Sequence, residues 1–317
     1  MERRDTLSFI EIKNLVKRYK GNTAVDNINF HIEKGELFGL LGPNGAGKST
    51  VISMLSGVLK PSSGNIYING NDVVEKNMMV KKILGLVPQD IALYPTLSAK
   101  ENLMFWGKMY GVPKVVLKSR VSEVLQIVGL EERKNEMIKN YSGGMKRRIN
   151  IGAALLHNPE ILIMDEPTVG IDPQSRNHIL ETVKKLNQEG MTIIYTSHYM
   201  EEVEYLCKQI GIMDKGKLIA FGNKDDIKKT VINKEKIEIK LSQITPVIGE
   251  TIKELPSVEK LIIKDRDITI YSKGNGELLA DIISITNKAK IKILSINIEE
   301  PNLESVFIHL TGKALRD

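Results

Sequence analysis

Short, mostly apolar runs alternate with longer amphipathic segments through the first two thirds of the chain. Such runs occupy 37–41, 161–164 and 192–196, and each is followed by glycine or polar residues. Runs of this kind predict strands that are buried on both faces, as in a parallel sheet covered by helices. Apolar residues recur with helical spacing over 51–59 and 148–156. The pattern therefore predicts an α/β fold.

The segment from 93 to 138 has a different pattern of apolar and polar residues. Leu97, Leu103, Trp106 and Met109 are interleaved with polar residues, and glycine and proline break the pattern at 111–113. This spacing predicts helices. We therefore expect a helical segment inserted between the strands.

A second unit is predicted after a polar boundary near 221–235, which gives domains at 1–224 and 235–317. The order of its elements, β-α-β-β-α-β, is that of a small α+β ferredoxin-like sandwich. A closing helix after Pro301 and Asn302 is also expected. The predicted strands lie at 237–241, 261–263, 268–271 and 291–298, the predicted helices at 247–255 and 276–288, and the closing helix has Leu303, Val306, Phe307 and Leu310 on one face.

A phosphate-binding loop follows the first apolar run. The sequence fits G-x-x-x-x-G-K-[ST] between a predicted strand and a predicted helix, the context in which this motif binds phosphate. Its glycines let backbone amides turn toward phosphate oxygens at a helix N-terminus. Lys48 is expected to reach the β- and γ-phosphates, and Ser49 to bind Mg²⁺. The candidate nucleotide-binding residues are Gly42, Pro43, Asn44, Gly45, Ala46, Gly47, Lys48, Ser49 and Thr50.

A second glycine turn, formed by Ser142, Gly143 and Gly144, precedes the helical stretch at 148–156. Unsatisfied amides and the helix dipole favour an anion at such a turn. The same tripeptide is also a common capping turn without a ligand. Because one phosphate loop is enough for one nucleotide, we interpret the second turn as completing the nucleotide site of another protomer.

Acidic and histidine side chains follow two of the predicted strands. Asp165 and Glu166 come after 161–164, and His198 comes after 192–196. Carboxylates beside an apolar strand are costly unless they meet a cation or a proton. In a phosphate-loop protein the Asp can hold Mg²⁺ and the Glu can polarise the attacking water. The alternatives are a surface turn for the acids and a structural histidine for His198, which we otherwise interpret as a γ-phosphate sensor.

Residues 1 to about 224 resemble the nucleotide-binding domain of an ABC transporter. The phosphate loop corresponds to the Walker A motif of that family, Gln89 to the Q-loop, and residues 141–145 to the signature motif. The resemblance implies a P-loop NTPase fold of the ABC type. It also implies that the helical segment at about 93–138 is the family's inserted helical subdomain.

The remaining motifs of the family occur in the family's order. Asp165 and Glu166 correspond to Walker B and the catalytic carboxylate, residues 170–172 to the D-loop, and His198 to the switch histidine. Tyr19 corresponds to the aromatic residue that stacks on adenine, although a tyrosine there could also simply cover the sheet edge.

The resemblance implies that two such domains pair head to tail around two ATP molecules. Each ATP would lie on Walker A of one protomer and under the signature amides of the other. Glu166 is implied as the general base, with Gln89 and His198 positioning water and γ-phosphate and Asp172 linking the two sites. Hydrolysis would remove the charge that bridges the protomers and let them separate. The implied magnesium ligands are Ser49, Gln89 and Asp165.

The signature motif departs from the common family pattern at two positions. Most members have Leu and Gln where this chain has Tyr141 and Met145. The Ser-Gly-Gly core is intact, so phosphate binding is expected to survive. Residues 141–148 resemble the branch that drives drug, antibiotic and polysaccharide exporters with separately encoded membrane subunits. The basic residues at 146–148 are expected to form a solvated face, with contact to an anion as the alternative.

Composition indicates the kind of ligands and the cellular compartment that suit the chain. The formal net charge is +6, and it lies in the first domain because acidic and basic residues nearly balance from Glu235 onward. Basic character there suits nucleotide phosphates and a surface near anionic lipid. The single cysteine, Cys207, is consistent with a reducing compartment. The sequence contains neither a signal-peptide core nor an apolar segment long enough to span a bilayer.

A transporter interpretation therefore requires an integral membrane permease as partner, beside a homodimer or another paired ABC ATPase. The chain is expected at the cytoplasmic face of the cell membrane as a peripheral subunit, with the transported substrate contacting the permease. Family resemblance places the permease contact at 91–96, where Leu93, Tyr94 and Pro95 are the preferred residues. No nucleic acid is expected as a ligand.

Two alternatives differ in kind from these expectations. The chain could be a soluble ABC ATPase acting on ribosomes or DNA, although such members usually carry two ATPase domains or long coiled-coil insertions. The C-terminal unit could bind RNA or a small molecule, but Tyr271 and Phe307 are its only aromatic residues and it is not basic. Dimerisation or regulation is the favoured role for this unit.

Overall fold

The structure, a computed structural model, describes residues 8–229, 235–272, 278–299 and 302–311. The chain divides by its internal contacts into two compact units, with the division after Asn223. All nucleotide motifs lie in the first unit.

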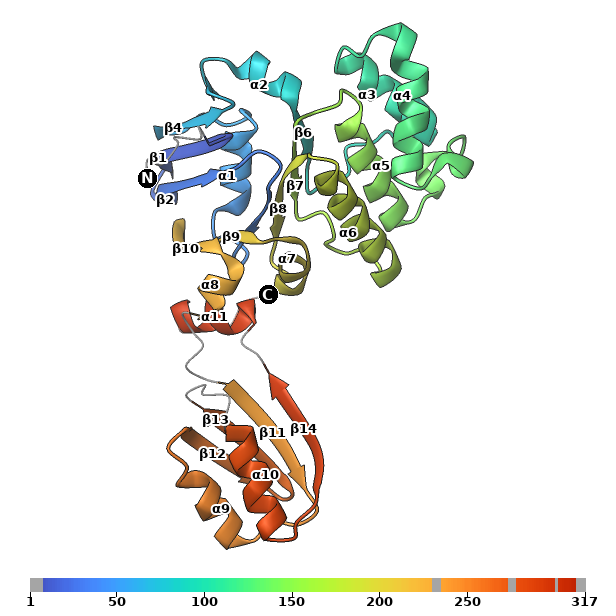
Figure 1. The fold of residues 1–317 in the computed structure, drawn as a ribbon. Helices are drawn as coiled ribbons and strands as arrows, with labels where there is room; N and C mark the ends of the chain where they lie inside the picture. The colour runs from blue at the N-terminus through green and yellow to red at the C-terminus, as the bar shows by residue number, and fades with distance from the viewer. Residues whose placement is uncertain (1–7, 230–234, 273–277, 300–301, 312–317) are drawn as a thin grey trace, which may run out of the picture. The chain divides into compact units, whose positions relative to one another are not determined.

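The first unit contains two sheets (Figure 1). A six-stranded sheet has the order β10-β9-β3-β8-β7-β6, in which every neighbouring pair is parallel except β9 and β10. A four-stranded antiparallel sheet has the order β2-β1-β4-β5. The strands of the first sheet are β3 (Leu37–Leu41), β6 (Leu84–Val87), β7 (Ile161–Asp165), β8 (Thr192–Ser197), β9 (Gln209–Asp214) and β10 (Lys217–Asn223), and those of the second are β1 (Ile10–Tyr19), β2 (Asn22–Ile32), β4 (Ser63–Ile68) and β5 (Asn71–Asp72).

The three apolar runs of the sequence form the centre of the larger sheet. Every residue of β3, β7 and β8 is buried, because helices or the second sheet cover both faces. The α/β prediction is therefore confirmed. The helices around these strands are α1 (Lys48–Leu55), α2 (Asn77–Ile83), α5 (Gly143–Leu155), α6 (Pro173–Gln188) and α7 (Met200–Leu206).

One helix differs from its prediction over 51–59. Helix α1 starts three residues earlier, at Lys48, and ends at Leu55. Gly57 follows with a φ of 65°, a left-handed conformation that ends helices. The apolar residues after Leu55 continue the pattern but not the helix.

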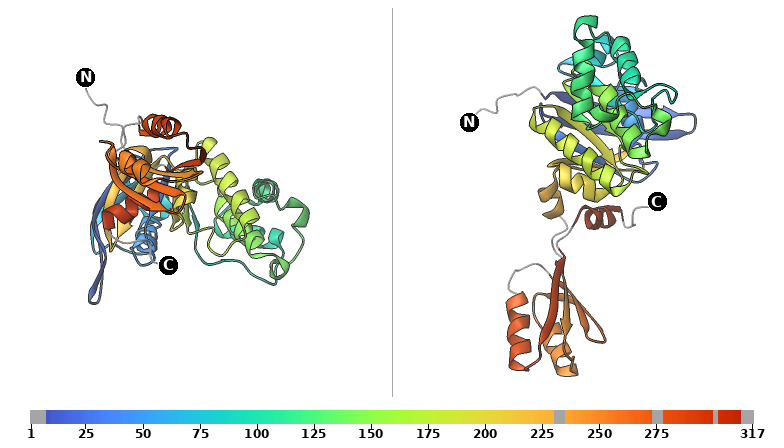
Figure 2. Two further views of the ribbon diagram at one scale, coloured as in Figure 1. Left: turned by 90° about the horizontal axis from the view of Figure 1, so that it is seen from below. Right: turned by 90° about the vertical axis from the view of Figure 1, so that its right-hand side faces the viewer.

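A helical lobe lies beside the two sheets and appears in green in Figures 1 and 2. It contains α3 (Ala99–Met109), α4 (Lys114–Ile127) and two short 3-10 turns, Glu131–Arg133 and Ile138–Asn140. Ser98 caps α3 with a capping box to Glu101, and Pro113 precedes α4. Both helices pack against α5, so the helix that begins at the second glycine turn belongs to this lobe.

The C-terminal unit has the ferredoxin-like order predicted from the sequence. Its sheet has the order β12-β13-β11-β14 and all neighbouring strands are antiparallel. Isoleucines of β11 and β13 form its core with α9 and α10. The elements are α8 (Lys224–Lys229), β11 (Glu235–Leu241), α9 (Pro246–Lys253), β12 (Val258–Lys264), β13 (Asp267–Ser272), α10 (Leu278–Lys288), β14 (Ile293–Glu299) and α11 (Leu303–Thr311).

Two details of this unit differ from the expectations. Residues 224–229 form helix α8, whereas the sequence was interpreted there as a polar boundary. Leu310 is exposed, so the closing helix buries Leu303, Val306 and Phe307 only. The predicted start of the helix at Gly276 lies outside the described residues.

Candidate nucleotide site

The phosphate loop joins β3 to α1 in a conformation that glycine alone accommodates at two positions. Gly42 has a φ of 152° and Gly47 a φ of 105°. A Cβ atom on Gly42 would lie 2.4 Å from the Met213 carbonyl oxygen, and one on Gly47 would lie 2.5 Å from the Ala24 carbonyl oxygen. The loop is therefore tightly packed against neighbouring backbone, with its last residue at the N-terminus of α1.

Lys48 is buried at the start of α1 and its ammonium group has three oxygen partners. The Nζ atom donates to the carbonyl oxygens of Gly42 and Pro43 at 2.7 and 3.2 Å. It also lies 3.1 Å from Oε1 of Glu166, and both side chains of this ion pair are buried. Lys48 is thus held in the loop by its own chain, with its charge offset by the candidate base.

Glu166 is the meeting point of the predicted catalytic residues. Its Oε2 atom accepts a hydrogen bond from Gln89 Nε2 at 3.3 Å and lies 3.5 Å from His198 Nδ1. The residue has a φ of 47°, a left-handed conformation that is uncommon for a side-chain-bearing residue. Such backbone strain persists where the surroundings enforce it, often at functional sites. The structure therefore brings Lys48, Gln89 and His198 around one carboxylate.

The proposed magnesium ligands supply the type of oxygen donors that Mg²⁺ prefers. Ser49 and Gln89 line the same cavity, and Asp165 directly precedes Glu166 at the end of β7. Asp165 Oδ1 accepts a hydrogen bond of 2.7 Å from the Thr196 hydroxyl. Asp165 is not among the residues that line the cavity, but hydroxyl, amide and carboxylate oxygens are the donor types that suit a hard divalent cation.

A cavity of about 490 Å³ opens over the phosphate loop. Its volume lies in the range of small-molecule sites. Several of its lining residues could not be predicted from the sequence because they belong to hairpin turns that are distant along the chain. The lining residues are Asn22, Thr23, Ala24, residues 44–50, Gln89, Glu166, Lys215 and Gly216.

Tyr19 is not among the residues that line this cavity. Tyr19 pairs across the β1–β2 hairpin with Asn22, which does line the cavity, and Tyr19 is 49% exposed. The Lys17 ammonium lies 5.4 Å from the ring centroid. Its adenine contact therefore stays a prediction, supported by proximity and by an accessible ring.

The second glycine turn begins α5 away from the phosphate loop of its own chain. Ser142 caps the helix, with its Oγ atom accepting from the Met145 amide at 3.2 Å. None of Ser142, Gly143 and Gly144 lines the cavity described above. A turn that completes the site of another protomer has to lie apart from the phosphate loop of its own chain, as these three residues do.

Gly144 and Asp172 connect this turn to the D-loop. Asp172 caps α6, and hydrogen bonds from the amide and hydroxyl of Ser175 hold the pKa of its carboxyl below the usual value. A Cβ on Gly144 would lie 2.1 Å from Ser175 Oγ and 3.2 Å from Asp172 Oδ2. The start of α6 therefore packs directly on the second glycine turn, a contact that demands glycine at 144.

The two unusual signature residues face inward and share one partner. Tyr141 and Met145 are buried. The Tyr141 hydroxyl donates to the Arg133 carbonyl oxygen at 2.7 Å, and Arg133 Nη1 donates to the Met145 sulfur at 3.4 Å. The Arg133 guanidinium also makes two hydrogen bonds to Glu136. These residues therefore stabilise the base of the turn.

The expectation of a solvated basic face at 146–148 is wrong for Arg147. This side chain is buried, and burial lowers the pKa of its guanidinium. Its Nη1 donates to the Pro88 carbonyl oxygen at 2.7 Å and its Nη2 donates to the Gln89 carbonyl oxygen. The α5 helix thus holds the backbone of the Q-loop.

Comparisons with known proteins agree with this geometry. The family model described as ABC transporter matches residues 25–169. The linearmycin resistance ATP-binding protein LnrL of Bacillus subtilis (strain 168) is 51% identical over 310 residues, which cover 97% of this chain and 100% of the relative. This chain belongs to the ABC transporter family. It is an ABC ATP-binding subunit, whose ATP hydrolysis powers transport.

One further relative matches this ABC subunit over nearly its whole length, and two solved structures match the larger part of it. The Nod factor export ATP-binding protein I of Cupriavidus metallidurans is 34% identical, covering 98% of this chain and 99% of the relative. A solved ATP-binding subunit of an ABC transporter has a TM-score of 0.64 at 30% identity, covering 70% of this chain and 93% of that chain. A dimeric ATP-binding cassette in a post-hydrolysis state with ADP and Pi has a TM-score of 0.62 at 27% identity, covering 68% and 98%.

Proposed function

We propose that this ABC subunit hydrolyses ATP between two paired copies and powers an exporter whose permease is a separate chain. The Glu166 carboxylate carries this proposal, because Lys48, Gln89 and His198 all converge on it beside the phosphate loop. The names of the relatives support export: one acts in linearmycin resistance, another in Nod factor export and a third in daunorubicin resistance. They favour this function over the ribosomal or DNA alternative.

The proposed roles follow from the atoms available. Glu166 accepts the proton of the attacking water, since it is the one carboxylate that lines the phosphate cavity in the described part of the chain. Gln89 and His198 hold Glu166 and orient the water and the γ-phosphate. Lys48 neutralises phosphate charge. A magnesium ion held by Ser49, Gln89 and Asp165 would offset the charge of the phosphate groups when bound.

A second copy is the proposed source of the missing half of each site. The amides at Ser142, Gly143 and Gly144 start a helix, and the packing of α6 against Gly144 ties them to Asp172. The described cavity contains none of them. A head-to-tail pair supplies these amides to ATP on the partner's phosphate loop, and the dimeric form of the solved cassette is consistent with that arrangement.

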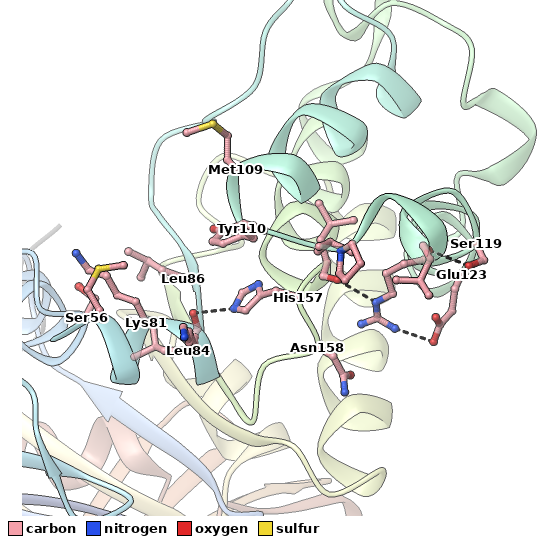
Figure 3. A pocket seen from close by; sticks show the side chains of 18 of the residues that line it. Ser56, Lys81, Leu84, Leu86, Met109, Tyr110, Ser119, Glu123, His157 and Asn158 are labelled. Atoms are coloured by element: carbon pink, nitrogen blue, oxygen red, sulfur yellow. Dashed lines mark hydrogen bonds and ion pairs between the residues drawn. The ribbon is translucent and has the colours of Figure 1, made fainter. Parts of the chain in front are cut away.

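We propose that a cytoplasmic helix of the permease binds a second, largely apolar cavity of about 990 Å³ (Figure 3). The cavity separates the sheet from the helical lobe: Leu84 and Leu86 come from β6, while Met109, Tyr110 and Val116 come from the lobe. Met109 is 67% exposed. A concave surface lined mostly by apolar side chains is typical of a binding site, and an amphipathic helix with an apolar stripe fits a groove of this chemistry.

This position differs from the contact predicted at 91–96. Leu93, Tyr94 and Pro95 do not line the cavity. Tyr94 is exposed, but its backbone is held by the buried Asn102, which accepts from the Tyr94 amide at 2.8 Å. We propose these residues as the rim of the permease contact and Met109 as its apolar centre.

The proposed location is the cytoplasmic face of the cell membrane, as a peripheral subunit. None of the helices in the described ranges has the length and apolarity needed to cross a bilayer. A permease would therefore carry the transported substrate. The C-terminal unit is proposed to serve dimerisation or regulation, and no role in binding nucleic acid is proposed.

Affinity purification of the tagged full chain from mildly cross-linked cells tests this function. We expect a polytopic membrane protein in the eluate, identified by mass spectrometry, and its loss in Met109→Glu. Val115→Glu is the matched control, since Val115 is 93% exposed but does not line the cavity. Recovery of ribosomes without a membrane protein would contradict the proposal. Equal recovery of the membrane protein with both variants would move the contact away from Met109.

A further inference from the structure

A buried carboxylate outside the nucleotide cavity collects side chains from three elements of the first unit. Glu202 lies on α7 and is 3% exposed. Its Oε2 atom accepts hydrogen bonds from the Thr168 hydroxyl at 2.7 Å, the Tyr195 hydroxyl at 2.9 Å and the Ser197 hydroxyl at 3.1 Å. Its Oε1 atom lies 3.4 Å from Arg176 Nε. We call these five residues the Glu202 cluster.

The Glu202 cluster gives one oxygen of this buried carboxylate three hydrogen bonds and the other oxygen an ion pair without a hydrogen bond. A carboxylate removed from water needs hydrogen-bond donors and a cation, and the three hydroxyls and Arg176 supply both. Burial and then the nearby Glu202 raise the pKa of the Tyr195 phenol well above its usual value, so this hydroxyl stays a donor. Removing one partner from such a network is costlier than losing a surface pair.

The donors of the Glu202 cluster adjoin two residues of the proposed catalytic site. Thr168 lies two residues after Glu166, and Ser197 directly precedes His198. The nearby backbone is strained at Glu166, with a φ of 47°. The amide of Glu166 is fixed by the Thr196 hydroxyl at 2.9 Å. Thr196 thus holds the backbone amide of Glu166, and Thr168 holds the turn two residues later through its hydrogen bond to Glu202.

We propose that Glu202 is a positioning residue that sets the relative placement of the Glu166 carboxylate and the His198 ring. This inference rests on the proposed roles of Glu166 and His198. Glu202 does not line the nucleotide cavity. It acts through Thr168 on the turn that carries Glu166 and through Ser197 on the strand end that carries His198, so one rigid anchor serves both.

The substitution Glu202→Gln tests the anchor with little change in volume. Glutamine converts one acceptor oxygen into an amide donor, which must face either Arg176 or the three hydroxyl donors. Glu201→Gln is the matched control, because Glu201 is the preceding residue and is exposed. Both variants are compared with the wild type as purified full chains, with kcat and KM for ATP measured and rates divided by the nucleotide-binding stoichiometry.

We expect Glu202→Gln to lower kcat about tenfold while KM for ATP stays within about twofold, because small misplacements of catalytic groups reduce turnover more than binding. Glu201→Gln should match the wild type. Equal kcat in the two variants would overturn the proposal. So would a rise in KM without a fall in kcat, or a loss of activity that disappears once rates are divided by binding stoichiometry, since these indicate a merely structural role.

Thr168→Val and Ser197→Ala keep the test decisive if Glu202→Gln does not fold. Each removes one hydroxyl donor to Glu202 and leaves the carboxylate in place. Both should lower kcat by a smaller factor at unchanged KM, and wild-type kcat in both would refute the anchor.

Glu166→Gln separates this inference from the proposed function. If Glu166→Gln is inactive and Glu202→Gln has the wild-type rate, only the inference fails. If the wild type has no ATPase activity that depends on Glu166, both fail.

Discussion

Replacing Glu166 by glutamine should separate ATP binding from ATP hydrolysis. The side chain keeps its shape but can no longer accept the proton of the attacking water. Loss of general-base catalysis costs about 10²- to 10⁴-fold in rate. We therefore expect kcat of Glu166→Gln to fall at least about 100-fold and ATP-bound pairs of the chain to accumulate.

The same substitution should strengthen ATP binding, since Glu166 competes with phosphate for Lys48 Nζ, which lies 3.1 Å from its Oε1. Two unit charges about 4 Å apart interact by about 4 kcal/mol at an effective dielectric constant near 20. The Glu166 carboxylate and a bound phosphate repel each other. Relief of even a quarter of an interaction of this size, about 1 kcal/mol, gives about fivefold tighter binding of ATP. The nucleotide-free protein should lose stability, up to about 3 kcal/mol, because Lys48 loses a buried partner.

Three measurements check this reasoning. Phosphate release gives kcat, titration with a fluorescent ATP analogue gives affinity, and analytical ultracentrifugation with ATP gives the paired fraction. The thermal shift caused by ATP should be larger in Glu166→Gln than in the wild type. Glu201→Gln serves as the control, since it removes an exposed charge nearby in sequence. Hydrolysis at the wild-type rate would refute the base assignment, and weaker ATP binding would refute the competition between Glu166 and phosphate.

Two further predictions concern packing and pH. Gly144→Ala should destabilise the chain by about 1–3 kcal/mol, because the new Cβ would lie 2.2 Å from Ser175 Cβ. Gly143→Ala is the control and should leave the melting temperature unchanged, because the atom nearest to its Cβ would be 3.9 Å away. Equal melting temperatures of the two variants would contradict the packing argument. Burial lowers the pKa of His157, as it does for His178, so the unfolded chain binds protons more readily than the folded one as pH falls below about 6.5. The contribution of these histidines to the free energy of unfolding should therefore be fully present above about pH 6.5 and be lost on acidification. His157→Gln should make the melting temperature depend less on pH between about pH 7 and 5.5. An unchanged pH dependence would exclude His157 as a contributor.

The central strands and the strand–loop–helix turn of the phosphate loop could be predicted because their signals are local. Buried parallel strands are continuous apolar runs, so β3 matches the predicted 37–41, and β7 and β8 each extend one residue past their runs. The phosphate loop likewise combines its glycines, its lysine and its helix start within nine residues, 42–50. The order of the ferredoxin-like unit follows from the same kind of pattern.

The supporting contacts of the site could not be predicted because their partners are distant in sequence. Arg147 and the Pro88 carbonyl are 59 residues apart, and Thr168 and Glu202 are 34 apart. A charged residue on a helix normally faces water, so sequence alone favours a solvated arginine. Only the packing of α5 against the Q-loop shows that Arg147 exchanges water for backbone carbonyls.

The signature departures illustrate how a binding motif can change without losing its ligand groups. The phosphate ligands proposed at this turn are backbone amides, which any residue other than proline can supply once the helix start is fixed. Tyr141 and Met145 fix that start through their contacts with Arg133, and Ser142 caps the helix. Gly144, by contrast, has no freedom to vary, because Ser175 occupies the space a side chain would need. At Gly144 the packing of a neighbouring helix therefore dictates the residue, whereas the buried positions Tyr141 and Met145 are matched to the Arg133 side chain and backbone that they contact.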